Sequence, residues 1–339
     1  MDSIDSLVTT SLEKDVGIIP APVFNPAFGA GIAVLPVFIY RPKGFHPETK
    51  PSTSQGIIYF NFTGRWLAGL KQTLYLNRNR FWIDAFAAYA SMNFKLYNNI
   101  TASKDDYREI KFEGFVSNLS FLVLARRHFY IGPIFSSNYL KQEEVGVSQP
   151  YQNEYHWYHT PGIKLSHDSR DDIFYPIEGW FSTLSFESLL PSKSYSYDFN
   201  KITAGISTYQ KLDGNGDKII ASRLYTQLGI GDLPLHEMAS PGASPILRGY
   251  ITGHYLNSSI ISLQSEYRWM FSDRWGTVGF LGYGWLFDQP NQIKENLGLY
   301  SIGAGIRYRF FQKFKINLAL DVAFGRNSAN VYFSLSESF

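Results

Sequence analysis

Apolar and polar residues alternate at a period of two along almost the whole chain. Successive side chains of a β-strand point to opposite faces, so this period predicts strands with one apolar and one polar face. No linker or low-complexity segment interrupts the pattern, which indicates a single β domain. The predicted strands, with ends uncertain by about two to four residues, are 16–24, 28–40, 55–64, 66–77, 80–93, 111–125, 127–140, 156–168, 178–189, 197–212, 217–231, 258–271, 274–287, 297–309, 314–325 and 329–339.

The composition of the two faces distinguishes between two kinds of β domain. In the strand 258–271, even positions such as Glu266 and Arg268 are polar, whereas Leu263 and Trp269 are apolar or aromatic. A soluble sandwich turns its polar face outward. Here the polar face combines Arg, Glu, Asp and Gly, which suits a wet interior, and 17% of all residues are aromatic. We therefore predict an all-β fold, a transmembrane antiparallel β-barrel of about sixteen strands, rather than a sandwich.

The next-to-last predicted strand repeats this split. Phe314, Ile316 and Leu320 share its apolar face and should contact lipid. Asn317 and Asp321 share its polar face and should point into the lumen.

Connection lengths orient the barrel. Connections after even-numbered strands are mostly short, such as 272–273, and those after odd-numbered strands are mostly long, such as 94–110. Outer-membrane barrels have short periplasmic turns and long extracellular loops. Both ends of the barrel domain, residues 16–339, should therefore lie on the periplasmic side. A short periplasmic segment, residues 1–15, precedes it, and a helix would suit this segment.

The connection from Gly231 to Asn257 is far longer than the usual hairpin loop of about two to five residues. Its apolar residues, such as Leu247 and Tyr250, and its three prolines argue against disorder. We predict an ordered loop that folds back onto its own protein, with Arg248 at the tip in need of a partner. The alternative is an exposed surface loop whose arginine is solvated.

Composition excludes several classes of protein. A net charge of +2 and the absence of a basic run argue against a nucleic-acid partner. The chain has no cysteine, which excludes a disulfide framework and a thiolate metal site. No apolar stretch is long enough for a transmembrane helix, and the polar, acidic N-terminus is not a signal peptide. No cofactor is predicted.

Candidate catalytic and metal-binding groups are few. His156 and His159 stand three residues apart on a predicted strand and so face opposite sides, which argues against a shared metal ion. The acidic stretches 167–172 and 213–217 are better explained as turns than as cation sites. There is no Gly-x-Ser-x-Gly motif of a hydrolase. We therefore predict a protein that is not an enzyme and has no metal site.

Four short stretches follow one another along the chain in a characteristic order. In chain order they are His167-Asp168-Ser169-Arg170-Asp171-Asp172 with Tyr175-Pro176 and Gly179-Trp180, then Leu247-Arg248-Gly249-Tyr250, then Glu266-Tyr267-Arg268, and last the aromatic ending 331–339. Together they resemble the BamA/TamA-type outer-membrane barrels, also called the bacterial surface antigen family, over residues 17–339. The resemblance implies a sixteen-stranded barrel whose sixth loop packs inside the lumen, in proteins that insert or translocate proteins or handle lipids.

The chain departs from this family in two ways. Where family members carry the thirteenth-strand aspartate that pairs with the loop arginine, this chain has Gly282. Insertases and secretion pores of the family also carry polypeptide-transport-associated domains before the barrel, whereas here only about 15 residues precede it. Either these domains are missing from the sequence, or the protein is one of the members that lack them.

The partner of Arg248 must therefore come from another strand. Glu266 shares the inward face of its strand with other polar residues and is the predicted partner, with Asp321 in reserve. Gly282 and Gly284 would leave the loop room to approach the wall.

The end of the chain is predicted to be both the last strand and a C-terminal assembly signal. Val331, Phe333, Leu335 and Phe339 should face lipid, with Phe339 at the periplasmic interface, and even positions such as Tyr332 should face the lumen. The alternative is an ordinary last strand without a signal role.

The first and last strands are predicted to meet in a weak lateral seam. Pro20 and Pro22 have the same parity, so their missing backbone donors lie on one edge of the first strand. Odd residues can pair with the second strand, which leaves the donor-poor edge facing Val331 and Phe333. The alternative is that the prolines simply end a strand near the periplasmic rim.

Three functions remain open. The first is assembly, insertion or translocation of proteins or lipids at the outer membrane of a Gram-negative bacterium. Its partners would be outer-membrane lipid, unfolded outer-membrane proteins, and periplasmic proteins or lipoproteins. The second function is that of a non-catalytic pore or scaffold barrel. The third is the barrel half of an autotransported, patatin-like enzyme.

Overall fold

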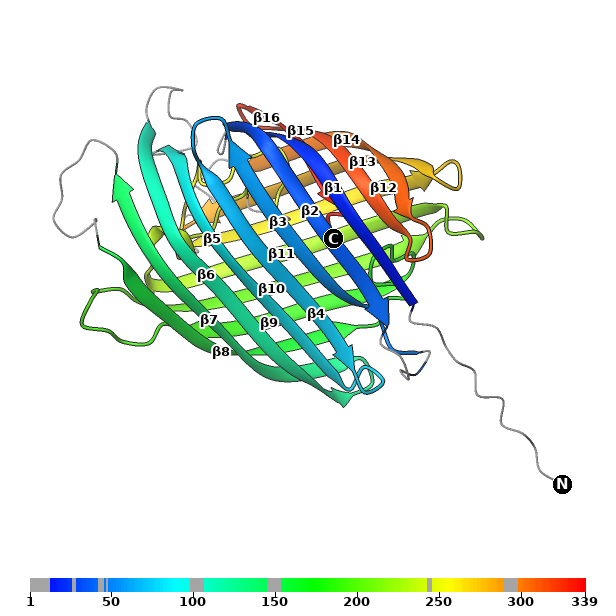
Figure 1. The fold of residues 1–339 in the computed structure, drawn as a ribbon, viewed down its shortest axis with the longest axis horizontal. Helices are drawn as coiled ribbons and strands as arrows, with labels where there is room; N and C mark the ends of the chain where they lie inside the picture. Colours follow the sequence, from blue (N-terminus) through cyan, green and yellow to red (C-terminus); the bar gives the residue numbers. More distant parts are fainter. Residues whose placement is uncertain are drawn as a thin grey trace.

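The chain forms one antiparallel sheet that curls into a nearly closed barrel (Figure 1). The structure is a computed structural model. It describes residues 13–25, 29–41, 46, 48–97, 107–144, 154–242, 246–289 and 298–339. Sixteen strands follow one another in the sheet in sequence order. The predicted all-β barrel of sixteen strands is confirmed.

Every predicted strand is present, with ends that differ by a few residues. The strands are β1 Glu13–Asn25, β2 Gly29–Arg41, β3 Ser52–Asn61, β4 Trp66–Leu76, β5 Phe81–Tyr97, β6 Tyr107–Arg126, β7 Phe129–Glu144, β8 His156–Asp168, β9 Gly179–Ser188, β10 Asp198–Lys211, β11 Lys218–Asp232, β12 Ser259–Met270, β13 Trp275–Phe287, β14 Leu299–Phe311, β15 Ile316–Gly325 and β16 Ser328–Leu335. A 3-10 helix, η1 (Leu235–Glu237), lies between β11 and β12. In the part of the chain that the structure describes, no helix is both long and apolar enough to cross a membrane.

The start of the barrel differs from the predicted domain boundary at residue 16. β1 begins at Glu13, so the last residues assigned to the N-terminal segment belong to the first strand. Residues 1–12, where a helix was expected, lie outside the described residues.

The two faces of the sheet carry the predicted residue types. Along β12, Leu263 and Trp269 are 54% and 41% exposed on the outer surface, whereas Glu266 and Arg268 are each 2% exposed. The outer face must contact lipid, and the inner face can keep polar groups because it surrounds a lumen where they find partners.

A β-bulge corrects the prediction for the start of β15. The ladder between β14 and β15 shifts between Arg309 and Phe311. The extra residue, Phe310 of β14, has no partner on β15, so the pair Phe311–Ile316 is out of step with the rest of the ladder. At this irregular start of β15, Ile316 is buried with Phe311 and Phe314 in one cluster, whereas Leu320 is exposed on the lipid face as predicted.

Short turns mark the end of the barrel where its first strand begins and its last strand ends. Because the number of strands is even, β1 starts and β16 ends at the same rim as the short β12–β13 and β14–β15 turns. A longer connection at this rim, residues 169–178, folds over the lumen. Its Phe174 is buried against Phe314, with ring centroids 6.3 Å apart. Lys50, before β3, reaches the last residue of β8, with Nζ 2.7 Å from Oδ2 of Asp168.

Candidate functional site

Loop 6, which we define as residues 233–258 between β11 and β12, folds against the inner wall of the barrel. Leu247 and Tyr250 are each 1% exposed. They belong to a buried cluster with Ile260 of β12 and Leu286 of β13. The apolar residues that argued against disorder thus hold the loop in place.

Arg248 lies between two carboxylates, which are the two that the sequence suggested as partners. Its Nη2 is 2.5 Å from Oε2 of Glu266, and its Nη1 is 2.9 Å from Oδ2 of Asp321. The guanidinium also lies over the ring of Phe280, 3.6 Å from the centroid. Arg248 therefore lies inside the lumen, against the inner face of the barrel wall, and not in extracellular solvent.

These carboxylates and the loop arginine belong to a closed ring of six alternating charges, which we call the charged ring. Glu266 contacts Nη2 of Arg268 at 2.7 Å, and Asp321 contacts Nη1 of Arg307 at 2.5 Å. Glu337, beyond the end of β16, joins these two arginines. Its Oε2 lies 2.8 Å from Nε of Arg307 and 3.9 Å from Nε of Arg268. Three arginines and three carboxylates give the ring a formal charge of zero.

Burial makes the charged ring depend on all of its members. Every one of the six side chains is at most 6% exposed. Burial alone would raise the pKa of Glu337, but Arg307 and Arg268 outweigh it and lower this pKa to about 2. A buried charge that loses its partner costs about 3–5 kcal/mol. The ring therefore joins loop 6, β12, β14, β15 and the C-terminal residues into one unit.

Two glycines let the loop tip approach the wall. Gly249 has a φ of +99°, and a Cβ there would lie 2.8 Å from the main-chain carbon of Phe324. A Cβ at Gly282 would lie 2.8 Å from Cδ1 of Leu247. Gly284 differs from the prediction, because a Cβ there would meet the neighbouring strand β12 and not the loop.

Loop 6 is also hydrogen-bonded to the last strands of the sheet. The hydroxyl of Tyr332 accepts from the N–H of Gly249 at 2.9 Å and donates to the carbonyl of Tyr250 at 3.1 Å. Ser328 donates to the carbonyl of Gly249. The hydroxyl of Tyr250 donates to the carbonyl of Tyr300 at 2.8 Å. Tyr332 thus faces the lumen, as its parity predicted.

The last four residues do not continue β16, which corrects the prediction for the C-terminus. The strand ends at Leu335, and Ser336 turns the chain with a φ of +79°. Nη2 of Arg268 then donates to the main-chain oxygen of Phe339 at 2.6 Å, so Phe339 meets the charged ring and not lipid at the interface. The signal that sequence analysis missed was Glu337, an acid on the face assigned to lipid.

Phe333 and Leu335 also differ from the prediction, because both are partly buried. Phe333 packs against a cluster that contains Ala21, and Leu335 packs against the cluster around Phe311. Val331 is 48% exposed, as expected of a lipid-facing residue. Phe333 thus reaches β1 across the side of β16 that has no hydrogen-bonded strand, whereas Leu335 contacts residues of β2, β14 and β15.

β1 and β16 lie side by side without a ladder, along a line that we call the seam (Figure 1). Across the described residues, the hydrogen-bonded order of the sheet ends at β1 on one side and at β16 on the other.

Three prolines determine which edge of β1 lacks donors. The β1–β2 ladder continues through the pair Ile18–Pro36, whereas the β2–β3 ladder has no pair at Leu35 or Pro36. The missing N–H of Pro36 therefore faces β3. Opposed residues of an antiparallel ladder point their backbone groups either toward each other or both away, in alternation. Pro20 and Pro22 share the parity of Ile18, so their missing donors point away from β2 and toward the seam.

A second buried ion pair holds the beginning of loop 6. Oε2 of Glu237, in η1, lies 2.5 Å from Nζ of Lys201, and Nδ2 of Asn138 donates to Oε1 at 3.2 Å. Sequence analysis missed this pair, because the pattern does not show which strand a loop residue will meet.

The acidic stretches act as turns, as predicted. Oδ1 of Asp213 accepts from the N–H groups of Gly216 and Asp217 at 2.7 and 3.0 Å. Oδ1 of Asp172 accepts from the N–H groups of Phe174 and Tyr175.

A sixteen-stranded barrel with an apolar outer face, whose long sixth loop is bound inside by a buried arginine, defines a class of outer-membrane β-barrel. A family model for the Omp85 superfamily domain matches residues 51–339. The chain belongs to the Omp85 superfamily, whose barrels are outer-membrane proteins of Gram-negative bacteria. The resemblance stated from the sequence is thereby confirmed.

Solved structures share the fold at low sequence identity. BamA from Haemophilus ducreyi lacking POTRA domains 1-3 has a TM-score of 0.59 and 11% identity, with 96% of this chain and 70% of that chain covered. CdiB from Escherichia coli has a TM-score of 0.62, 13% identity and coverages of 97% and 63%. CdiB from Acinetobacter baumannii has a TM-score of 0.59, 9% identity and coverages of 97% and 66%. The chain thus spans less than two thirds of either CdiB chain. A search of curated proteins found no match.

Proposed function

We propose that this barrel inserts or translocates proteins or lipids at the outer membrane, and that they pass through the seam between β1 and β16. The observation that carries the proposal is the missing ladder between these strands. Membership of the Omp85 superfamily and the fold shared with BamA and CdiB support it.

The chemistry of the two strand edges suits lateral passage. A backbone group without a partner in lipid costs several kcal/mol, so most barrels close completely. On β1, Pro20 and Pro22 have no N–H to leave unpaired at the seam, which reduces the cost of an open edge. The edge of β16 keeps its donors and acceptors and is the better template for an incoming strand.

We propose partners on the same grounds. Unfolded outer-membrane proteins would meet the seam from the periplasmic rim, where β1 begins and β16 ends. Periplasmic proteins or lipoproteins would dock at this rim, and outer-membrane lipid surrounds the outer face.

A reversible disulfide across the seam tests the proposal. The chain has no cysteine, so an engineered pair has no background. Val23→Cys combined with Phe333→Cys places one thiol on each strand, at side chains that pack against the same cluster. Ile302→Cys with Phe324→Cys is the matched control, because these lipid-exposed residues are already opposed in the β14–β15 ladder, away from the seam.

The purified barrels are reconstituted in lipid vesicles and compared before and after oxidation. One assay measures insertion of an unfolded outer-membrane barrel protein by protease protection, and the other measures transfer of a fluorescent phospholipid between vesicles. Oxidation of the seam pair should lower at least one activity, reductant should restore it, and the control pair should change neither. Unchanged activities with a fully oxidised seam would rule out lateral passage.

A further inference from the structure

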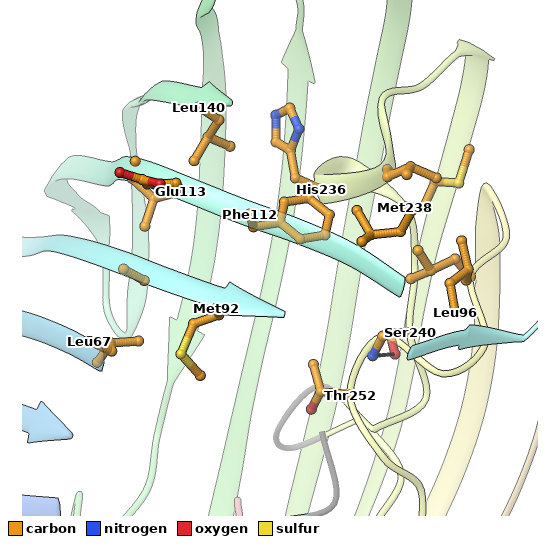
Figure 2. Close-up of a pocket in the computed structure, with 17 residues that line it drawn as sticks. Leu67, Met92, Leu96, Phe112, Glu113, Leu140, His236, Met238, Ser240 and Thr252 are labelled. Atoms are coloured by element: carbon orange, nitrogen blue, oxygen red, sulfur yellow. Dashed lines mark hydrogen bonds between the residues drawn. The ribbon is translucent and has the colours of Figure 1, made fainter. Parts of the chain in front are cut away.

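A cavity of about 310 Å³ lies in the lumen between loop 6 and the inner faces of β4 to β7 (Figure 2). Its wall side includes Met92, Leu96 and Phe112, and its loop side includes Leu235 and Met238. Ligand sites are mostly apolar cavities of roughly 300–1,000 Å³ with a few polar groups. The cavity therefore has the size and lining of a ligand site, in a part of the barrel that the charged ring does not occupy.

Most polar side chains around this cavity already have partners within the protein. Ser240 accepts from a main-chain N–H of loop 6 at 3.0 Å, and Thr252 donates to a loop carbonyl at 2.7 Å. Glu113 pairs with a lysine of its own strand at 3.2 Å. Nδ1 of His236 lies 2.6 Å from the amide nitrogen of Gln142, and in the described residues its Nε2 has no hydrogen-bond partner. A peptide or a sugar needs many more polar contacts than this, whereas a hydrocarbon chain needs none.

Apolar side chains connect the cavity to the seam. Met92 and Leu67 both line the cavity. Met92 also belongs to the buried cluster that contains Ala21 and Tyr59, and Leu67 packs against this cluster. Phe333 of β16 packs against the same cluster. This apolar path runs over β1 to β5, whereas the wall strands that supply the charged ring are β12, β14 and β15. Apolar side chains thus form a continuous contact from the seam to the cavity, and none of the six charges of the ring belongs to it.

We propose that the cavity binds one hydrocarbon chain of a membrane lipid, which reaches it through the seam. Apolar walls around water are unfavourable, and a hydrocarbon chain that replaces the water removes this cost. The route through the seam rests on the proposed function, but binding in the cavity does not.

Photolabelling in lipid vesicles tests the cavity. The full chain is reconstituted with phosphatidylethanolamine that carries a diazirine near the end of one acyl chain, and labelled residues are located by mass spectrometry after irradiation. Label is expected at Met92, Leu96 and Met238 inside the barrel, and at Leu263 on the outer face, which serves as a reference for bulk lipid. Label at Leu263 alone would overturn the proposal.

A matched pair of variants on β5 tests the occupant. Ala90→Phe fills the cavity, because Ala90 lines it. Ala87→Phe adds the same ring on the outer face, opposite the lipid-exposed Leu70. Only Ala90→Phe should abolish label at Met92 and Leu96, with the label at Leu263 unchanged. Cavity label that survives Ala90→Phe would show that the probe binds elsewhere.

Two further experiments test separately the route by which the hydrocarbon chain reaches the cavity and the molecule from which it comes. Oxidising the Val23→Cys, Phe333→Cys pair before adding the labelled phospholipid should abolish cavity label, and persistent label would overturn the route. A diazirine fatty acid is tested in parallel. If it alone labels the cavity, the ligand is a free acid and the membrane-lipid source is overturned. Cavity label together with failed insertion and transfer would refute the proposed function and leave the lipid site standing.

Discussion

Replacing Arg248 with glutamine should release loop 6 from the wall of the barrel. The substitution leaves the charged ring with two arginines and three carboxylates, a formal charge of −1 instead of zero. Glu266 and Asp321 would each keep a single arginine, at 2.7 and 2.5 Å. Because glutamine keeps much of the side-chain length, the substitution removes mainly the charge.

The size of the effect follows from the burial of the ring. Loss of one partner from a buried ion pair costs about 3–5 kcal/mol. Since about 1.4 kcal/mol changes an equilibrium tenfold, release of the loop should become roughly a hundredfold to a few thousandfold more favourable. The double variant Arg248→Gln, Glu266→Gln restores neutrality and should recover part of the loss, with a coupling energy of about 0.5–3 kcal/mol.

Limited proteolysis of the folded barrel measures release of the loop, and urea unfolding followed by tryptophan fluorescence measures stability. The Arg248→Gln variant should be cut within loop 6 faster than wild type and should unfold at lower urea. Lys211→Gln is the control, because its ion pair with Glu178 is exposed to solvent, and it should change neither readout. If Arg248→Gln resists protease and urea as well as the control does, the charged ring does not hold the loop.

Three other predictions concern the same half of the barrel. Gly282→Val should destabilise it by about 1–3 kcal/mol through contact with the loop side chain above it, whereas Gly279→Ala on the same strand has open space and should be neutral in urea unfolding. The ion pair of Glu337 with Arg307 should stabilise the C-terminal residues fully above the ordinary pKa of 4.5 and lose this effect as the pH falls toward about 2. Hydrogen exchange of these residues should show that loss, and a Glu337→Gln variant with the same pH dependence would contradict it. Deleting Phe339 should reduce the amount of folded barrel in cells if the ending is an assembly signal, and a heat-modifiable band of unchanged intensity would count against that role.

The alternation of apolar and polar side chains was enough to predict the strands. This alternation depends only on neighbouring residues in the sequence, so closure of the barrel does not change it. The inward position of Glu266 follows from the same parity and explains why it could be named as a partner of Arg248. Asp321 was assigned to the lumen in the same way, although whether both acids would reach the loop depended on the spacing of strands around the barrel.

Features that interrupt the alternation could not be predicted from it. Phe314 and Ile316 are buried at the irregular start of β15, where the ladder shifts near Arg309, and no residue type in that stretch indicates the shift. The positive φ of Ser336 ends the last strand early, although Glu337 on a lipid face was a warning that the strand does not continue. The contact between Lys201 and Glu237 depends on how loop 6 crosses the lumen, which is a property of the closed barrel.

The hydrogen bonds of Tyr332 give the two sides of the seam unequal freedom to move. Through this residue β16 is attached to loop 6, and through Glu337 the residues after it are attached to Arg307 on β14. On the other side of the seam, the described contacts of β1 with the last strands include apolar ones, as where Gly17 lies against the ring of Phe311 and Ala21 belongs to the cluster on which Phe333 packs. If the seam widens as proposed, we expect the N-terminal strands to swing outward while the C-terminal strands keep their place. A molecule that leaves the barrel by this route would then meet lipid on the side of β1.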